Sequence, residues 1–189
     1  MKVIDIQQKT PEWYEFRRRH IGASDSPIIM GDSPFTTKEE LWSQKVFDVR
    51  KDTTHAMQRG IDLEPKAREF FIKETGIEVF PLVAEDDTHP FLSASFDGIS
   101  LDGKTILEIK CPSTQEGVNR FPDIYTAQFQ KQMYIAGVNE MHYLAYFMIK
   151  EDRGVCITTK IIKIHRDQFY IDKMIEKEVQ FWETIKDLL

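Results

Sequence analysis

Two carboxylates and a lysine lie in two adjacent runs of strand-forming residues. The Asp-Gly pair at 102–103, between the runs, indicates a tight hairpin, because a two-residue type I′ turn needs residues that tolerate positive φ. Such a turn places Asp97 directly opposite Glu108, and Ser95 directly opposite Lys110. Side chains alternate along a strand, so we expect these four residues on one face of the hairpin.

The charges on this face indicate which chemistry it supports. Directly opposed residues have Cβ atoms roughly 4.5–5.5 Å apart, and like charges at that separation destabilise a sheet. A divalent cation offsets the repulsion between Asp97 and Glu108, and hard carboxylate oxygens suit Mg²⁺ or Mn²⁺. Lys110 can hold or deprotonate a water beside the metal, so the pattern predicts metal-assisted hydrolysis. Without this register, Glu108 and Lys110 form only a weak exposed ion pair. The opposite face carries side chains for the core, Phe96, Leu107 and Ile109.

The rest of the sequence predicts the elements that position this hairpin. Apolar residues recur at helical spacing over 56–75, and Gly76 then supplies a C-cap. Further helices are expected over 11–17, up to residue 30 with Ser24 as N-cap, and over 38–46, 122–136 and 166–189. Strands are expected over 77–80, 91–101, 105–111, 141–149 and 155–164, the last two joined by a turn at 151–154. The pattern indicates an α/β (α+β) fold, a mixed central sheet flanked by helices.

The composition fits one globular domain over residues 1–189, large enough to bury a substantial core. No apolar run approaches the ~18 residues of a membrane helix, and residues 1–10 lack the apolar segment of a secretory signal. Two cysteines are too few for a disulfide framework, so we expect a cytoplasmic location. The net charge of −6 does not favour nucleic acid, but the basic cluster at 17–20 indicates either a local phosphate site or a solvated helix face.

Residues 95–98 (SFDG) and 108–112 (EIKCP) resemble the PD-(D/E)XK nuclease signature. More closely, they resemble the phage lambda exonuclease family, also called YqaJ-like viral recombinases. Three further segments resemble motifs of that family in the same order, at 13–24, 60–64 and 125–134. One departure is Phe96, which stands where the family usually has proline. The resemblance implies a restriction-endonuclease-like core and a metal-dependent DNA nuclease.

By this resemblance, the residues of the hairpin face receive roles. Asp97 and Glu108 would bind two ions of Mg²⁺ or Mn²⁺, and the carbonyl of Ile109 and the side chain of Glu64 would add ligands. Lys110 would position the attacking water. The implied catalytic set is Glu64, Asp97, Glu108, Lys110 and Gln128.

The resemblance also implies a pocket for the 5′-terminal phosphate of DNA, formed by Arg17, Ser24 and Ser95. A guanidinium forks onto phosphate oxygens, and a serine near a helix N-terminus adds a hydroxyl and backbone donors. From the residues alone, Arg17 is one of several surface arginines and Ser24 is an N-cap. Glu64 likewise has a second interpretation, an i,i+4 ion pair with Arg68.

Three functions are compatible with these residues. An exonuclease that digests the 5′-ended strand of linear double-stranded DNA, leaving 3′ single-stranded overhangs for recombination, is favoured because an end-directed enzyme needs a phosphate pocket. A PD-(D/E)XK endonuclease of restriction or repair type is the alternative. A non-catalytic DNA-binding module is disfavoured, because it would have no reason to keep opposed carboxylates.

The family resemblance implies partners as well. It suggests a ring-shaped homotrimer in a phage or prophage recombination system, with a single-strand annealing protein as a possible partner. No G-x-x-x-x-G-K-[ST] loop occurs, so ATP is not expected. Met57, two turns before Glu64 on its helix, could part the DNA strands or pack in the core.

Overall fold

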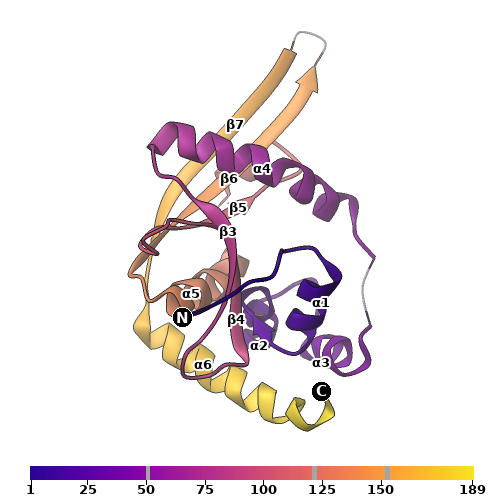
Figure 1. Ribbon diagram of the computed structural model, residues 1–189. Helices are drawn as coiled ribbons and strands as arrows, with labels where there is room; N and C mark the ends of the chain where they lie inside the picture. The colour runs from indigo at the N-terminus through magenta and orange to yellow at the C-terminus, as the bar shows by residue number, and fades with distance from the viewer. Residues whose placement is uncertain (50–51, 121–122, 152–153) are drawn as a thin grey trace.

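The computed structural model describes residues 1–49, 52–120, 123–151 and 154–189, and Figure 1 shows helices flanking a central sheet. The strands are β1 (Lys2–Ile4), β2 (Ile21–Gly22), β3 (Phe80–Glu85), β4 (Leu92–Ile99), β5 (Ile106–Lys110), β6 (Glu140–Glu151) and β7 (Gly154–His165). The α-helices are α1 (Pro11–Arg18), α2 (Ser26–Met30), α3 (Lys38–Phe47), α4 (His55–Thr75), α5 (Thr126–Ala136) and α6 (Gln168–Glu183). Short 3₁₀ turns are η1 (Ala23–Asp25), η2 (Glu116–Asn119), η3 (Asp123–Tyr125) and η4 (Lys186–Leu188).

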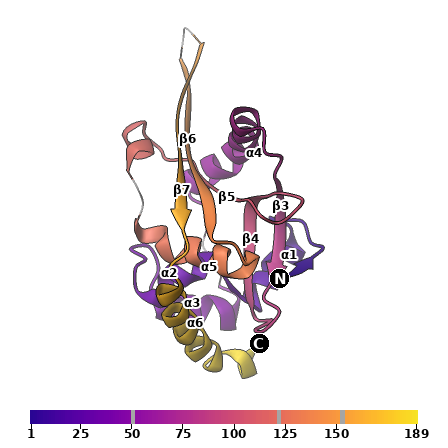
Figure 2. The same ribbon diagram turned by 90° about the vertical axis from the view of Figure 1, so that its left-hand side faces the viewer.

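The strands form one mixed sheet in the order β1-β3-β4-β5-β6-β7, and β2 pairs with β4 off this path. The β5–β6 and β2–β4 pairs are parallel, whereas the other neighbours are antiparallel. This arrangement confirms the predicted α/β fold. Figure 2 shows the β6–β7 hairpin extending well beyond the helices. The turn predicted at 151–154 includes residues 152 and 153, which lie outside the described residues.

Two apolar cores hold the helices against the sheet. The larger core packs α2, α5 and α6 against one face, with Phe129 and Phe181 among its members. The smaller core packs α4 against the other face, through side chains that include Ala67 and Phe71. Burial of this apolar surface is the main force that fixes the helices in place.

Strand β5 lies between the two cores, and its side chains alternate between them. Leu107 and Ile109 belong to the smaller core under α4. Glu108 and Lys110 therefore project to the other face, where their side chains contact α5. The sheet thus presents both charged residues to one helix.

The boundaries of several elements differ from those predicted. Helix α4 is confirmed, with Thr54 as N-cap and Gly76 as C-cap at a φ of 71°. The strand expected over 77–80 is wrong, because β3 begins only at Phe80. Ser24 is not the N-cap of α2, since it lies inside η1 and Asp25 precedes the helix.

The two C-terminal helices are also shorter than expected. Helix α5 begins at Thr126 after the turn η3, and the expected start at Pro122 lies outside the described residues. Helix α6 ends at Glu183, whereas the predicted helix continued to residue 189. No helix in the described parts of the chain has the length and apolar character of a membrane span.

Candidate active site

The hairpin of β4 and β5 closes through a longer turn than predicted. Ser100 N–H donates to the Thr105 carbonyl and Gly103 N–H donates to the Ser100 carbonyl, each at 2.9 Å. A four-residue loop therefore spans 101–104. Of the Asp102–Gly103 pair only Gly103 has a positive φ, 69°, so the predicted type I′ turn is wrong. The longer loop has the same centre as the two-residue turn, and it sets the same register.

The predicted register holds next to the turn but breaks at the carboxylates. Gly98 pairs with Leu107, as expected. Asp97 and Glu108 come next, but they do not continue the ladder. Instead, the backbone N–H of Ile109 donates to Asp97 Oδ2 at 2.8 Å. The Asp97 side chain thus takes the place of a backbone acceptor between the strands.

A β-bulge in β4 causes this break. Phe80 of β3 pairs with Ile99, but Leu82 pairs with Phe96, so β4 carries one extra residue between the two pairs. The extra residue reverses the alternation of side chains. Phe96 and Ile99 lie in the larger core, whereas Leu107 of β5 lies in the smaller one. The predicted shared face of Phe96 and Leu107 is therefore wrong. The face predicted to join Ser95 with Glu108 and Lys110 is wrong too, because side chains alternate along β4 and Ser95 points away from Phe96.

Two side chains donate hydrogen bonds to carbonyls at the bulge. Gln8 Nε2 donates to the Phe96 carbonyl at 2.9 Å, and Arg68 Nε donates to the Asp97 carbonyl at 2.6 Å. Sequence reasoning assigned neither role. Both contacts join the bulge to distant segments, Gln8 from the N-terminus and Arg68 from α4, and they fix the backbone that carries Asp97.

Glu108 is buried and held by three side chains. It is 2% exposed. Its Oε1 accepts from Lys110 Nζ at 2.5 Å and from Gln128 Nε2 at 2.8 Å. Its Oε2 accepts from Gln132 Nε2 at 2.6 Å. The predicted residues Lys110 and Gln128 therefore meet at Glu108. Gln132 is a further contact of Glu108 that sequence reasoning missed.

Lys110 remains a cation in this setting. Burial alone disfavours its charge, but attraction to Glu108 and Asp97 outweighs burial and raises the pKa of Lys110 above its ordinary value. Its Nζ lies 4.5 Å from the ring centroid of Tyr125, and it donates to Gln128 Oε1 at 3.2 Å. Lys110 is therefore suited to hold an oxygen atom or a negative charge rather than to accept a proton.

The pKa of Asp97 is raised as well, which for a carboxyl disfavours the charged form. Burial, and then the nearby carboxylates of Glu108 and Glu64, hold the pKa of Asp97 well above its ordinary value. Glu64 itself forms an ion pair with Arg68 and a second with Lys9 Nζ at 2.6 Å. The ion pair of Glu64 with Arg68 is therefore confirmed, and its charge also acts on Asp97.

The oxygen atoms of this centre fit a hard divalent cation. Asp97 and Glu108 supply carboxylates, which Mg²⁺ and Mn²⁺ prefer, and the Ile109 carbonyl stays a predicted further ligand. A cation would relieve the repulsion that raises the pKa of Asp97. In the described part of the chain, no three His, Cys, Asp or Glu side chains are grouped so that they could hold a metal. Glu64 is held by two cations instead, and its role as a ligand stays a prediction. We call Asp97, Glu108, Lys110 and Gln128 the carboxylate centre.

The three residues predicted to bind phosphate are connected through Trp13. Arg17 Nη2 donates to Ser24 Oγ at 2.7 Å. The Arg17 guanidinium lies 4.6 Å from the centroid of the Trp13 ring. Trp13 Nε1 in turn donates to Ser95 Oγ at 2.9 Å. These four residues form the arginine–serine cluster, in which Trp13 is the member whose role sequence reasoning missed.

The rest of the basic cluster at 17–20 is engaged elsewhere. Arg18 and Arg19 both form ion pairs with Glu15, at 2.9 and 2.6 Å. His20 Nδ1 lies 2.7 Å from the Phe16 carbonyl, and burial lowers the pKa of His20. Arg17 is therefore the member of this basic run that joins the arginine–serine cluster.

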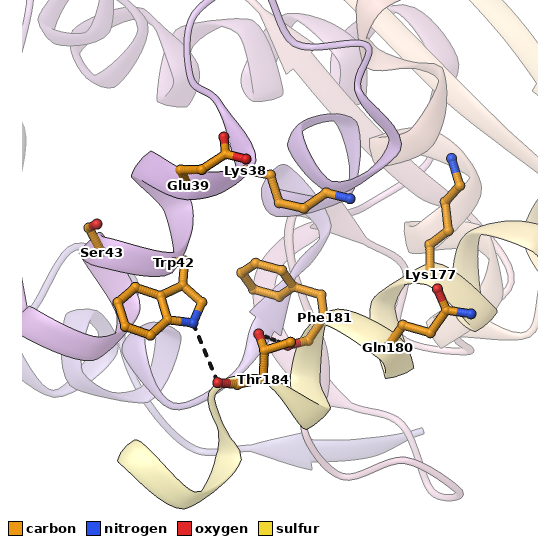
Figure 3. A pocket seen from close by; sticks show the side chains of 8 residues that line it. All are labelled: Lys38, Glu39, Trp42, Ser43, Lys177, Gln180, Phe181 and Thr184. Atoms are coloured by element: carbon orange, nitrogen blue, oxygen red, sulfur yellow. Dashed lines mark hydrogen bonds between the residues drawn. The ribbon is translucent and has the colours of Figure 1, made fainter.

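Two further features lie outside these groups. Met57 is 53% exposed, so its interpretation as a core residue is wrong. A pocket of about 550 Å³ lies between α3 and α6, and Figure 3 shows Trp42 and Phe181 at its wall. Its lining contains none of the predicted site residues: Lys38, Glu39, Trp42, Ser43, Lys177, Gln180, Phe181 and Thr184.

The fold and motifs agree with a family comparison. Residues 12–139 match the model of the YqaJ-like viral recombinase domain, so the chain belongs to this family and the predicted resemblance is confirmed. The uncharacterized protein YqaJ of Bacillus subtilis (strain 168) is 28% identical over 179 residues, which are 90% of this chain and 54% of that protein. The chain thus spans about half the length of the curated relative that it matches.

Solved structures of exonucleases have a similar fold. An alkaline exonuclease, LHK-Exo from Laribacter hongkongensis, is 27% identical with a TM-score of 0.74, covering 94% of this chain and 93% of that chain. LHK-Exo in complex with dAMP is 26% identical with a TM-score of 0.72, over the same shares. A phage-related exonuclease from Haemophilus somnus 129PT, 17% identical with a TM-score of 0.68 over 89% and 94% of the two chains, shares the fold.

Proposed function

We propose that the protein is a metal-dependent DNA exonuclease that digests the 5′-ended strand of linear double-stranded DNA and leaves 3′ overhangs for recombination. Membership of the YqaJ-like viral recombinase family supports this proposal. The similar solved structures are named as exonucleases, and one of them holds dAMP, a nucleotide with a single phosphate. Exonucleolytic digestion releases nucleotides of this kind.

One observation carries the choice of an end-directed enzyme. Ser95 of the arginine–serine cluster and Asp97 of the carboxylate centre are two residues apart on β4, roughly 7 Å along a strand. We therefore expect a phosphate that binds Arg17, Ser24 and Ser95 to lie near the carboxylates. An endonuclease has no need for such a pocket, so this neighbourhood favours an exonuclease.

The residues of the chain have distinct roles in this proposal. Mg²⁺ bound by Asp97, Glu108 and the Ile109 carbonyl would polarise the phosphodiester and lower the pKa of a water nucleophile. Lys110 keeps its proton and holds the attacking water or the charge that develops on phosphate. Gln128 orients Lys110 and Glu108, because its amide bonds to both side chains.

The arginine–serine cluster would bind the terminal phosphate. The Arg17 guanidinium can fork onto two phosphate oxygens, and its stacking on Trp13 limits its freedom before the ligand arrives. Ser24 and Ser95 each add a hydroxyl donor. This recognition positions the first phosphodiester of the strand for attack.

Digestion of three DNA substrates tests the proposal. A linear duplex with 5′ phosphates, the same duplex with 5′ hydroxyls and a closed circle are compared in Mg²⁺ and in EDTA. We expect 5′ mononucleotides from the phosphorylated duplex, slower release from the hydroxyl duplex, and no product from the circle or in EDTA. Rapid cutting of the circle would favour the endonuclease alternative.

Lys110→Met is the matching variant. Removing the cation should slow digestion by about 10²-fold, which is about 2.7 kcal/mol in the barrier. DNA binding should survive, because the arginine–serine cluster is intact. Lys104→Met is the control, since Lys104 lies on the same hairpin with its side chain 84% exposed. Equal rates for both variants would exclude a role for Lys110.

Four further expectations, drawn from the family resemblance or from the sequence, stay predictions. They are a ring-shaped homotrimer, a single-strand annealing protein as partner, a cytoplasmic location and no use of ATP. Sedimentation equilibrium tests the first, because a trimer has three times the mass of one chain. A monomer under digestion conditions would exclude the ring.

A further inference from the structure

Gln132 is a buried amide that contacts the carboxylate centre without belonging to the predicted site. It lies on α5, one helical turn after Gln128, so both side chains point to the same strand. Gln128 donates to one oxygen of Glu108 and Gln132 donates to the other, at 2.8 and 2.6 Å. Two neutral donors thus fix the plane of the carboxylate, in addition to its ion pair with Lys110.

Gln132 also joins the two groups of the proposed site. Its Nε2 lies 3.4 Å from the carbonyl of Ser95, as well as bonding to Glu108. Ser95 is the member of the arginine–serine cluster that lies on β4, and Asp97 of the carboxylate centre follows two residues later on the same strand. One amide group therefore connects β5 with the part of β4 on which both groups depend.

The remaining polar atom of this side chain is not satisfied by the fold. Gln132 is 0% exposed, and its Oε1 has no hydrogen-bond partner. Such an orphaned acceptor destabilises a fold. The amide cannot gain by turning over, because its oxygen would then face the carboxylate of Glu108. Gln132 therefore supplies a donor to Glu108 while its own acceptor stays unpaired, as expected of a residue placed to hold that carboxylate.

We propose that Gln132 is a positioning residue that orients Glu108 toward the divalent cation and ties this orientation to the strand of Ser95. The inference rests on the proposed function. Polar groups that orient a metal ligand commonly change metal affinity or activity by about 10- to 100-fold when they are removed. Gln132 acts through Glu108 and does not itself touch the reacting atoms.

Gln132→Met tests this role, because methionine fills a similar volume and donates no hydrogen bond. The first readout is the affinity of the full chain for Mn²⁺ without DNA, measured by titration calorimetry. We expect the affinity to fall about 10- to 100-fold. With 5′-phosphorylated duplex, kcat at fixed Mg²⁺ should fall by a similar factor while KM for DNA stays near the wild-type value. The melting temperature of the metal-free protein should change little, because loss of the donor to Glu108 Oε2 opposes removal of the orphaned oxygen.

Gln130→Met is the matched control on the same helix. Gln130 is also buried, but its amide bonds to the His165 carbonyl and to the Asp167 N–H, away from Glu108. We expect a lower melting temperature with unchanged Mn²⁺ affinity. If Gln132→Met binds Mn²⁺ and digests DNA like Gln130→Met, the positioning role is overturned.

Asp97→Ala separates this failure from failure of the proposed function. If Asp97→Ala loses Mn²⁺ binding but Gln132→Met keeps it, only the inference about Gln132 is wrong. If the wild-type chain binds no Mn²⁺ and digests no DNA, the proposed function is wrong and the inference is overturned with it.

Discussion

The carboxylate centre and the arginine–serine cluster share strand β4 but differ in their access to solvent. Glu108 is 2% exposed and accepts hydrogen bonds from three side chains. The Arg17 side chain is 32% exposed to solvent, and Ser24 is exposed as well. A buried centre strengthens electrostatic interactions with a reacting group, whereas an open cluster suits a phosphate that must enter and leave. We therefore propose that the first group carries out the chemistry and that the second selects the DNA end.

The largest expected effect comes from Asp97→Asn in the carboxylate centre. The amide loses a metal ligand, so digestion should slow by about 10³-fold or more, which is about 4 kcal/mol in the barrier. Stability should rise, because burial and two neighbouring carboxylates disfavour the charge of Asp97 in the folded protein. Single-turnover digestion and thermal melting measure the two effects. Wild-type digestion by this variant would remove Asp97 from the centre.

A smaller and more selective effect is expected from Arg17→Ala in the arginine–serine cluster. Hydrogen bonds to a charged group contribute about 1.5–3 kcal/mol, so kcat/KM for 5′-phosphorylated ends should fall by roughly 10- to 100-fold. Duplexes with 5′ hydroxyls should be digested at the wild-type rate. Arg19→Ala is the control, because Arg19 is paired with Glu15 at the surface. An equal loss on both kinds of end would contradict the division between chemistry and selection.

How far the site could be predicted from the sequence depends on which contacts are local. The hairpin register was predictable, because the composition of the loop at 101–104 fixes its centre. The bulge was not, because it depends on the pairing of Leu82 with Phe96, and the sequence placed the neighbouring strand at 77–80. The consequence is that Asp97 bonds to the Ile109 N–H instead of facing Glu108 across a regular ladder.

Gln132 was missed for a different physical reason. Every residue of α5 from Ala127 to Met133 is buried, including its glutamines and Lys131. A helix buried on all sides has no apolar stripe that indicates which side chains face the sheet. The family motif identified Gln128, but the role of its neighbour one turn later depends on how α5 docks. Trp13 was recognised as part of a motif, and its bond to Ser95 required the three-dimensional structure.

The smallest expected effect concerns Met57, which lies outside both groups. Its exposure on α4 fits the predicted wedge between DNA strands. Met57→Ala should leave the free energy of unfolding within about 0.5 kcal/mol, as for most surface substitutions. Loss of an apolar contact of about 0.8 kcal/mol should slow digestion of fully paired ends roughly fourfold. Digestion of frayed ends should not change, and equal slowing of both ends would argue against a wedge.

The central claim is that Asp97 and Glu108 together hold the divalent cation of a nuclease. Anomalous scattering from a crystal soaked in Mn²⁺ tests it most directly. We expect a manganese peak between the two carboxylates and within coordination distance of the Ile109 carbonyl. A map with no ion there, or with manganese bound only elsewhere on the chain, would contradict the claim.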